Sequence, residues 1–225
     1  MSNNDFCIVI PIKNEEKTIG DILDRCLNLS SNILIVDGHS SDRSLEIVRD
    51  KRVPFVFDNN KGKGDALKVG VKNTKQKIIV FIDGDGSHEV EDIPKILEPI
   101  RKGEADLVVG SRMLGGSDEL HGTFSKFIRN TGNNLLAVLI NLKWKTDLTD
   151  IENGFRAIKR EVFYALKLKS NGFTIEQEMI LKCLKLGYRV REVASHEYER
   201  KFGNSKLKTS QGFLFLLHFF KEYFF

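Results

Sequence analysis

Short apolar runs alternate with amphipathic segments over the first half of the chain, and this pattern limits the fold more than any other feature. The apolar runs are bounded by polar turns and lie at 6–12, 33–36, 53–57, 78–82 and 107–109. Runs of this kind are typical of strands buried on both faces, as in a parallel sheet. The segments between them carry apolar residues at helical spacing, at 16–27, 42–49, 63–72 and 93–101. The alternation predicts right-handed βαβ units, and so an α/β, Rossmann-like fold with a mostly parallel central sheet flanked by helices.

The rhythm changes after residue 110. A Gly-rich loop at 110–122 precedes an expected helix at 124–142, a polar turn at 145–153 and a mixed region of helices and short strands. The sequence shows no internal repeat and no linker rich in Pro or Ser. Because 225 residues suffice for one large α/β domain, we expect a single domain over 1–225, with halves at 1–110 and 111–211 and a C-terminal helix at 212–225.

The composition excludes several classes of protein. With 41% apolar and 29% charged residues, the chain is an ordered globular protein, and its net charge of +4 is too small to argue for nucleic acid. The cysteines at 7, 26 and 183 are far apart, which argues against a disulfide framework or a zinc site. The N-terminus lacks the pattern of a secretory signal, and no stretch reaches the ~20 apolar residues that span a bilayer. We therefore expect a cytoplasmic protein.

Two carboxylates, Asp83 and Asp85, directly follow the fourth apolar run and are separated only by Gly84. They can converge on one hard cation, while the glycine lets a ligand approach the backbone. Oxygen ligands alone favour Mg²⁺ or Mn²⁺, which keep open positions for diphosphate oxygens. The alternative is a solvated Asp-Gly turn or a cap for the helix expected near Glu91. The place at the end of a buried strand favours the metal site, because ligands of open parallel sheets bind beyond the strand carboxyl ends.

Other segments carry weaker signals. Asp37 ends the second run and is placed to accept hydrogen bonds from a base or a ribose. The turn around Lys63 could bring an ammonium group near phosphates, although it matches neither a Walker pattern nor a full G-x-G-x-x-G. Glu176 and Glu178, near an expected helix start, are interpreted as first-turn acids favoured by the helix dipole.

Seven motifs in a fixed order extend over nearly the whole chain, at 9–16, 36–42, 62–67, 83–88, 110–112, 150–156 and 200–206. This set resembles the family 2 glycosyltransferases with the GT-A fold, particularly the dolichyl-phosphate mannose and glucose synthases. No single motif is decisive, but seven in the right order are highly specific for the family. The resemblance implies that the first half binds a nucleotide sugar and that the second half binds the acceptor.

What the resemblance implies for the donor can be stated residue by residue. The nucleoside pocket would be lined by Pro11, Lys13 and Glu15, and Asp37 would face the base. Asp83 and Asp85 would hold Mg²⁺ or Mn²⁺ on the diphosphate of a UDP- or GDP-linked sugar, with Lys63 nearby. Arg200 and Lys206 would come from a loop that closes on the phosphates.

The resemblance also implies an acceptor site. Arg112 would meet the acceptor phosphate or the transferring sugar, and Lys126 or Arg129 would help to bind a lipid phosphate. The sequence departs from the family in two places. Ser87 stands where Gln is often found, so water would complete the metal shell, and Asn153 replaces the usual Ser or Thr before Gly-Phe-Arg.

These residues together imply an inverting, metal-dependent transfer of a hexose to polyprenyl or dolichyl phosphate, with the chemistry carried by Asp85, Arg112, Arg200 and Asp150. Asp150 is the candidate base if the acceptor is a hydroxyl, and otherwise it orients Arg112 or caps a turn. A phosphate monoester, with a second pKa of about 6, is already ionised at neutral pH and needs no base. The alternatives are a same-fold glycosyltransferase with a hydroxyl acceptor and a nucleotidyltransferase.

The last thirteen residues are unlike the rest of the chain, because they hold six of its 16 Phe. This tail is too short to span a bilayer. It is interpreted as an interfacial anchor at the inner face of the membrane or as a self-association surface that makes a homo-oligomer, while half of it could pack as a last core helix.

Overall fold

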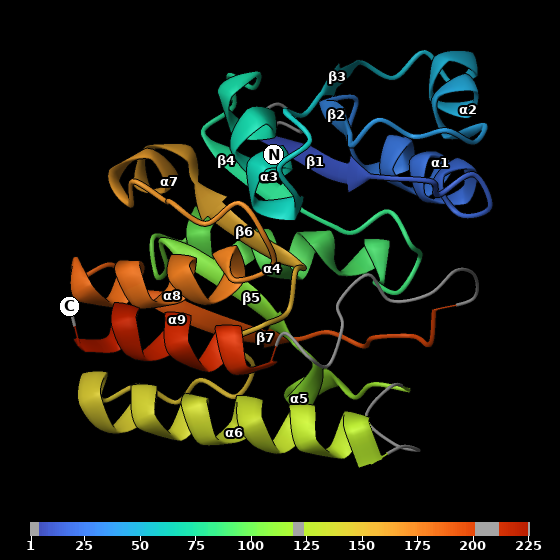
Figure 1. Cartoon of the computed structure of the whole chain (residues 1–225). Coiled ribbons are helices and arrows are strands. Elements are labelled where there is room, and N and C mark those ends of the chain that lie inside the picture. The colour runs from blue at the N-terminus through green and yellow to red at the C-terminus, as the bar shows by residue number, and fades with distance from the viewer. Residues whose placement is uncertain (1–4, 119–123, 201–211, 225) are drawn as a thin grey trace.

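The computed structural model describes residues 5–118, 124–200 and 212–224 and contains one seven-stranded sheet (Figure 1). In spatial order the strands are β3 (Phe55–Phe57), β2 (Ile33–Asp37), β1 (Phe6–Ile12), β4 (Ile78–Phe81), β6 (Arg156–Lys159), β5 (Leu107–Ser111) and β7 (Val190–Ala194). Only β6 runs antiparallel to its neighbours, β4 and β5, and every other pair is parallel. The mostly parallel sheet expected from the apolar runs is confirmed.

Helices connect the strands and cover both faces of the sheet. In the first half these are α1 (Ile19–Leu29), α2 (Ser44–Asp50), α3 (Lys63–Lys72), the 3-10 turn η1 (Val90–Asp92) and α4 (Ile93–Arg101). The second half contributes α5 (Arg112–Gly115), α6 (Phe124–Trp144), α7 (Arg160–Ala165), α8 (Ile175–Lys185) and α9 (Gly212–Phe224). The short helix α5 lies in the segment expected as a Gly-rich loop, and the boundary expected after residue 110 falls inside β5.

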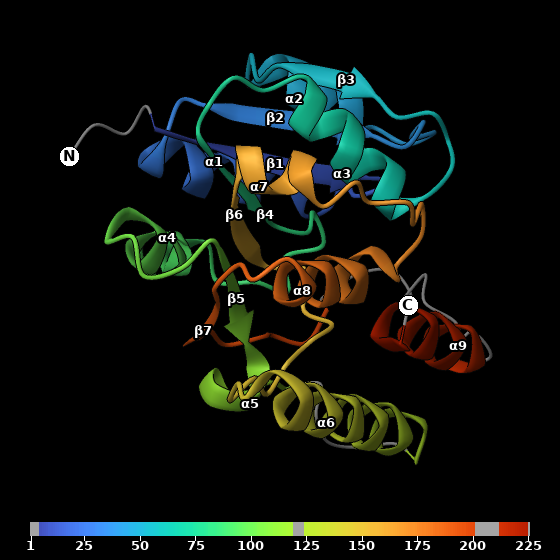
Figure 2. The ribbon, with the colours of Figure 1, turned by 90° about the vertical axis from the view of Figure 1, so that its left-hand side faces the viewer.

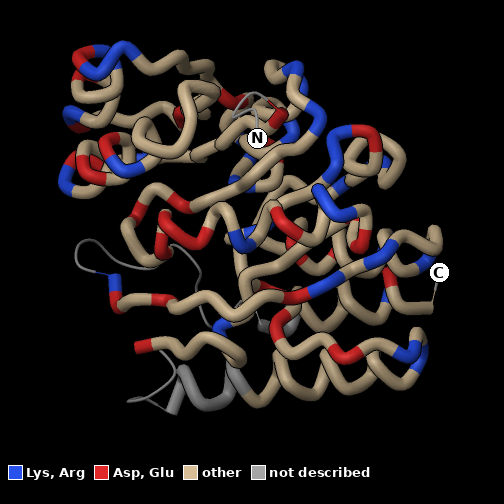
Figure 3. The backbone as a smooth tube through the Cα atoms, turned by 180° about the vertical axis from the view of Figure 1, so that it is seen from behind, with Lys and Arg blue, Asp and Glu red and all other residues tan. Residues whose placement is uncertain are grey.

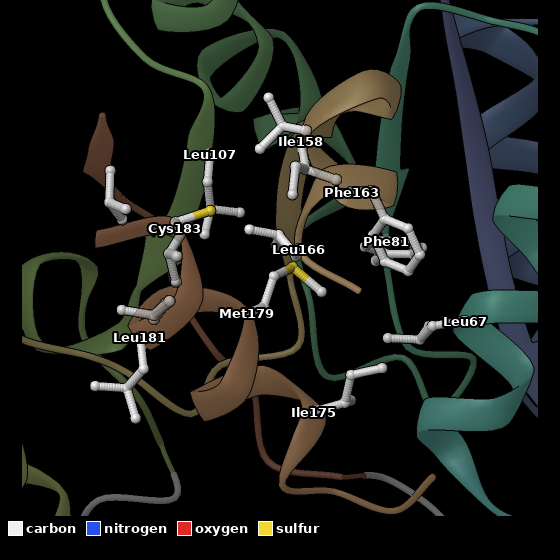
Figure 4. Close-up of a cluster of buried hydrophobic side chains, with 14 of the residues drawn as sticks. Leu67, Phe81, Leu107, Ile158, Phe163, Leu166, Ile175, Met179, Leu181 and Cys183 are labelled. Carbon is white, nitrogen blue, oxygen red and sulfur yellow. The ribbon is translucent and has the colours of Figure 1, made fainter. Parts of the chain in front are cut away.

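Alternation along the strands produces a hydrophobic core on each face of the sheet. Val9 of β1 and Phe81 of β4 point into the core beneath α3, α6, α7 and α8, part of which Figure 4 shows. Their sequence neighbours Ile8 and Val80 point into the opposite core, beneath α1, α2 and α4. Because the central strands are buried on both faces, their sequences are almost continuously apolar.

The C-terminal helix α9 packs between α8 and α6, as both views show (Figures 1 and 2). Its Phe219 is fully buried in the core, and Tyr223 contacts the ring of Trp144 on α6. Leu217, Phe220 and other apolar side chains of α9 remain exposed. None of the helices in the described ranges is long and apolar enough to cross a bilayer.

Candidate active site

Two adjoining cavities open at the carboxyl ends of β1, β2, β4 and β5. The first has a volume of about 220 Å³ and the second about 130 Å³. The residues that line both are Lys63, Asp83, Asp85, Phe173 and Arg200. The paired carboxylates after β4 therefore stand at the junction of two binding spaces, as expected for a site that brings two substrates together.

Asp83 is held by a lysine and a histidine. The Lys63 Nζ atom lies 2.7 Å from Asp83 Oδ1 and 2.9 Å from Oδ2. His88 Nε2 lies 3.5 Å from Oδ2, and its ring stacks on Phe155. Burial raises the pKa of Asp83, but the charges and hydrogen bonds of Lys63 and His88 outweigh it and hold the pKa far below its usual value. Asp83 is therefore a carboxylate at any physiological pH.

Asp85 is oriented by its own loop. Its Oδ1 accepts hydrogen bonds from the Ser87 backbone N–H at 3.0 Å and from Ser87 Oγ at 2.6 Å, while Oδ2 pairs with the Arg200 guanidinium. The loop packs closely on β1, since a Cβ added at Gly84 would lie 2.8 Å from Ile12 Cγ2. Ser87, the departure noted in the sequence, thus serves to fix the direction of the Asp85 carboxylate.

Glu176, at the start of α8, reaches the same lysine from the other side. Its Oε1 lies 3.0 Å from Lys63 Nζ, and its side chain is 3% exposed. The interpretation of Glu176 as a first-turn acid is right for its place in α8 but missed this contact. No signal in the linear pattern could have found it, because it depends on how α8 packs against the start of α3.

The first cavity contains the residues expected to bind a nucleoside. Pro11, Lys13 and Glu15 line it, and Lys13 Nζ donates a hydrogen bond to Asn60 Oδ1 at 3.3 Å. Asp58, which the sequence did not single out, lines the same wall and accepts a hydrogen bond from the Asn60 N–H at 2.7 Å.

Asp37 does not line the first cavity. Its side chain is fully buried, and its carboxylate accepts hydrogen bonds from Ser40 Oγ at 2.5 Å and from the Ser40 N–H at 2.9 Å. The adjacent Gly38 lines the cavity in its place. In this structure Asp37 shapes the turn after β2, and its expected contact with the base stays a prediction.

Arg112 lines the second cavity, and its guanidinium group is ion-paired with the carboxylate of Asp150. Arg112 Nε donates to Asp150 Oδ2 at 2.6 Å and Nη2 donates to Oδ1 at 2.9 Å, while Nη1 lies 3.4 Å from Glu197 Oε1. Asp150 is fully buried. Burial raises the pKa of Asp150, but the charge and hydrogen bonds of Arg112 outweigh it and keep the pKa below its usual value. An inaccessible carboxylate of this kind is suited to orienting Arg112, one of the three roles considered for it.

Three expected phosphate-binding residues cannot be placed. Lys126 and Arg129 belong to α6, but their side chains lie outside the described part of the structure. Lys206 falls in 201–211, also outside the described residues. Their roles remain predictions.

The metal-ligating side chains at the junction of the two cavities supply part of the coordination that a hard divalent cation needs. Asp83 and Asp85 offer carboxylate oxygens only, as Mg²⁺ and Mn²⁺ prefer. Within the described ranges no group of three or more His, Cys, Asp or Glu side chains is arranged around a common point. Two carboxylates would therefore hold the ion together with donor diphosphate oxygens and water.

Comparison with known proteins agrees with this geometry. The model of "Glycosyl transferase family 2" matches residues 7–167. The glycosyltransferase AglJ of Haloferax volcanii is 33% identical over 200 residues, which cover 88% of this chain and 64% of that relative. The undecaprenyl-phosphate mannosyltransferase of Micrococcus luteus is 30% identical over 214 residues, 88% of this chain and 86% of that protein.

The fold is shared with glucosyl-3-phosphoglycerate synthase from Mycobacterium tuberculosis, solved with Mg²⁺ and UDP. The TM-score is 0.74 at 21% identity, over 96% of this chain and 79% of that one. The expected GT-A fold is thus confirmed. Because the family model matches most of this chain, the chain belongs to glycosyltransferase family 2.

Proposed function

We propose that the protein transfers a hexose from a UDP- or GDP-linked sugar to polyprenyl or dolichyl phosphate, with inversion at the anomeric carbon and with Mg²⁺ or Mn²⁺. The observation that carries the proposal is the meeting of two cavities at Asp83 and Asp85, with a cationic side chain, Arg112, in the second.

The first cavity is assigned to the donor. Pro11, Lys13 and Glu15 would bind the nucleoside, and Asp83 and Asp85 would hold the cation. When bound, this ion supplies positive charge against the diphosphate leaving group. Lys63 and Arg200 line the same junction and add positive charge where the glycosidic bond breaks through an oxocarbenium-like state.

The second cavity is assigned to the acceptor phosphate. Arg112 offers a planar guanidinium held in a fixed direction by Asp150, which suits a phosphate monoester. A hydroxyl acceptor would need a base, and the Asp150 carboxylate is buried, ion-paired and of low pKa. This favours an acceptor that is already ionised. The name of the Micrococcus luteus relative, undecaprenyl-phosphate mannosyltransferase, supports the same acceptor class.

The lipid part of the acceptor places the reaction at a membrane, and we assign α9 and α6 to that surface. Phe215 of α9 lines the second cavity beside Arg112. Further along, Leu217 and Phe220 of α9 and Leu142 of α6 are exposed. Charged positions are few along the described part of α6, as Figure 3 shows. We propose peripheral attachment to the inner face of the membrane, with self-association through α9 as the alternative.

The test is a transfer assay with purified protein, Mn²⁺ or Mg²⁺, radiolabelled UDP-glucose, UDP-N-acetylglucosamine or GDP-mannose, and a short-chain polyprenyl phosphate. We expect labelled lipid and release of the nucleoside diphosphate from one donor. Asp85→Asn and Arg112→Lys should each reduce transfer by about 100-fold or more, whereas Lys68→Met, outside the site, should not.

Two outcomes would contradict the proposal. Release of pyrophosphate from UTP or GTP with a hexose 1-phosphate, supplied in place of the nucleotide sugar, would indicate a nucleotidyltransferase. Transfer to free sugar hydroxyls in preference to lipid phosphate would indicate the same-fold alternative, and Asp150→Asn should then abolish transfer.

A further inference from the structure

We infer that Lys63 couples the binding of the divalent cation to the binding of the nucleoside diphosphate, and that Glu176 is the positioning residue that makes this exchange work. The inference rests on the proposed donor site and assigns a role to Glu176, a residue that the motifs do not mark. It follows from the way in which one ammonium group is shared between two carboxylates.

Lys63 occupies the place where a cation is needed. Its Nζ contacts both oxygens of Asp83, at 2.7 and 2.9 Å, so a metal ion bound to Asp83 would lie close to the ammonium and repel it towards another partner. The side chain is 15% exposed and lines both cavities. Burial lowers the pKa of Lys63, but Asp83 and Glu176 outweigh it and raise the pKa, so the group that must be displaced is charged.

Glu176 offers the displaced ammonium a second partner at the same point. Within the described residues its only ion pair joins Oε1 to Lys63 Nζ, at 3.0 Å, and both of its carboxylate oxygens are buried without a contact of hydrogen-bond geometry. Arg156, fully buried nearby, donates from Nη1 to the backbone oxygen of Glu176 at 2.9 Å and leaves the carboxylate to Lys63. Arg156 therefore fixes the backbone of Glu176, and the Glu176 carboxylate can still accept hydrogen bonds from a displaced ammonium.

The start of α3 gives Lys63 little freedom to go elsewhere. The Asp65 N–H donates to the Asn171 carbonyl at 3.1 Å, and a Cβ at Gly64 would lie 2.6 Å from the Ser170 carbonyl oxygen. The helix start is therefore pressed against the loop before α8. Lys63 can exchange partners by rotation of its side chain, while its Cα stays in place.

These contacts make each ligand improve the affinity for the other. A cation at Asp83 leaves the ammonium with Glu176 alone, in a site that is mostly shielded from water. A nucleoside diphosphate in the first cavity would give the freed ammonium a second anionic partner. Coupling of this kind is reciprocal, because it is a free energy shared by the two binding steps.

The experiment is calorimetric titration of Mn²⁺ into the full chain, with and without saturating UDP or GDP. The measured quantity is the ratio of the two Mn²⁺ affinities. We expect a ratio of about tenfold or more in the unmodified protein, within the usual range of such couplings. No step depends on turnover, so the measurement is independent of the acceptor.

Substitutions of Lys63 and of Glu176 should change the ratio of the two Mn²⁺ affinities in opposite directions. Lys63→Met removes the competitor, so Mn²⁺ alone binds more tightly and the ratio falls by about fivefold. Glu176→Gln leaves the displaced lysine with no anionic partner unless the nucleotide is present, so Mn²⁺ alone binds more weakly and the ratio rises. A Glu176 that acted only through its own negative charge on the metal would weaken both affinities equally and leave the ratio unchanged.

Matched controls come from the same helices. Lys68→Met removes a cation from α3 that bonds to Asn171, and Glu178→Gln removes a buried carboxylate of α8 that pairs with Lys182. Both should keep the ratio of the unmodified protein. Lys63→Gln replaces Lys63→Met if the latter fails to fold, as judged by circular dichroism.

The outcomes separate this inference from the proposed function. A ratio that is unchanged in the Lys63 variants, or that moves the same way in the Lys63 and Glu176 variants, overturns the coupling role. An unmodified protein that binds neither Mn²⁺ nor either nucleotide overturns the donor site itself, and with it the inference.

Discussion

Three cationic side chains that line the two cavities already face a carboxylate. Lys63 pairs with Asp83, Arg200 with Asp85, and Arg112 with Asp150. Charged ligands must therefore enter by exchanging partners with these groups. Such exchange costs less than creating unpaired charges in a partly buried site.

The backbone of Gly154 lies very close to the charged groups of Lys63 and Asp83. A Cβ at this position would lie 2.6 Å from Lys63 Nζ and 2.8 Å from Asp83 Oδ2. We expect Gly154→Ala to push these groups apart and to weaken Mn²⁺-dependent nucleotide binding by about tenfold, a loss of ~1.4 kcal/mol. The melting temperature should change little, because both contacting atoms end side chains that can move.

Gly132→Ala is the matched control for this substitution. Gly132 lies within α6, and an added Cβ would meet nothing within 4 Å. This change should stabilise the helix by about 0.5–1 kcal/mol and leave binding unchanged. Calorimetry and thermal melts of both variants check the pair, and normal binding by Gly154→Ala would show that the close contact is tolerated.

The acids at the strand ends could be predicted from sequence, and their partners could not. Asp83 and Asp85 can be recognised because parallel strands end at one edge of a sheet. Glu176 and Glu197 reach Lys63 and Arg112 from segments far along the chain. Their contacts are set by packing, about which local periodicity carries no information.

Among the elements, α9 has two unlike faces. Phe219 is fully buried, whereas Leu217 is 52% and Phe220 42% exposed. Deletion of the whole helix would open the core, so the membrane assignment is better tested on the exposed face. We expect Leu217→Glu with Phe220→Glu to reduce flotation with anionic liposomes by about tenfold or more, since two apolar side chains leave the interface.

The same variant should bind Mn²⁺ and nucleotide normally, which shows that it is folded. Phe219→Ala is the contrasting change and should cost about 3–5 kcal/mol of unfolding free energy. Unchanged flotation of the double variant would contradict the membrane role. Conversion of a dimer into a monomer in light scattering would identify α9 as a self-association surface.

Strand β5 is joined to both neighbours through Asp106, the residue before it. Lys159 Nζ lies 2.7 Å from Asp106 Oδ1, and the Arg189 N–H donates to Oδ2 at 2.9 Å. Burial raises the pKa of Asp106, but hydrogen bonds from Arg189 and Lys159 outweigh it and lower the pKa to about 2. The ionised form is therefore favoured by folding.

Because the folded pKa lies below the unfolded value of about 3.9, this stabilisation is fully present above about pH 4 and is lost as the pH falls towards 2. We expect the melting temperature of the unmodified protein to fall across this window, and that of Asp106→Asn to fall less. Parallel pH curves for the two proteins would contradict the assignment.

The elements of the first half could be read from sequence, while β6 and β7 could not be located. Strands β1, β2 and β4 are nearly uniform apolar runs, and the expected helix at 63–72 matches α3. Strand β6 contains the buried Arg156, and β7, at the sheet edge, carries Arg191 and Glu192. Charged residues at these places hide short strands from any pattern based on hydrophobicity.

At the scale of the whole molecule, one sheet connects both halves. Strand β6 from the second half pairs with β4 of the first half and with β5. We therefore expect unfolding in urea to be a single transition, since neither half can keep the sheet complete alone. The single domain over 1–225 is a prediction that this experiment tests.

The chain offers a convenient probe for this test, because Trp144 is its only tryptophan and ends α6. Its fluorescence should change at the same urea midpoint as the far-ultraviolet circular dichroism of the whole chain. Separate midpoints would divide the protein into two units.

The position of β6 in the sheet also affects folding during synthesis, because β6 is made long after its partner β4. Strand β4 is complete at Phe81, but the strand that covers its open edge begins only at Arg156. At ~5–20 residues per second, a ribosome needs about 4–15 s to make the segment between them. For that interval the nascent chain carries an unpaired strand edge of the kind that attracts other chains. We therefore expect a fragment that ends between these strands to aggregate more readily than the full chain.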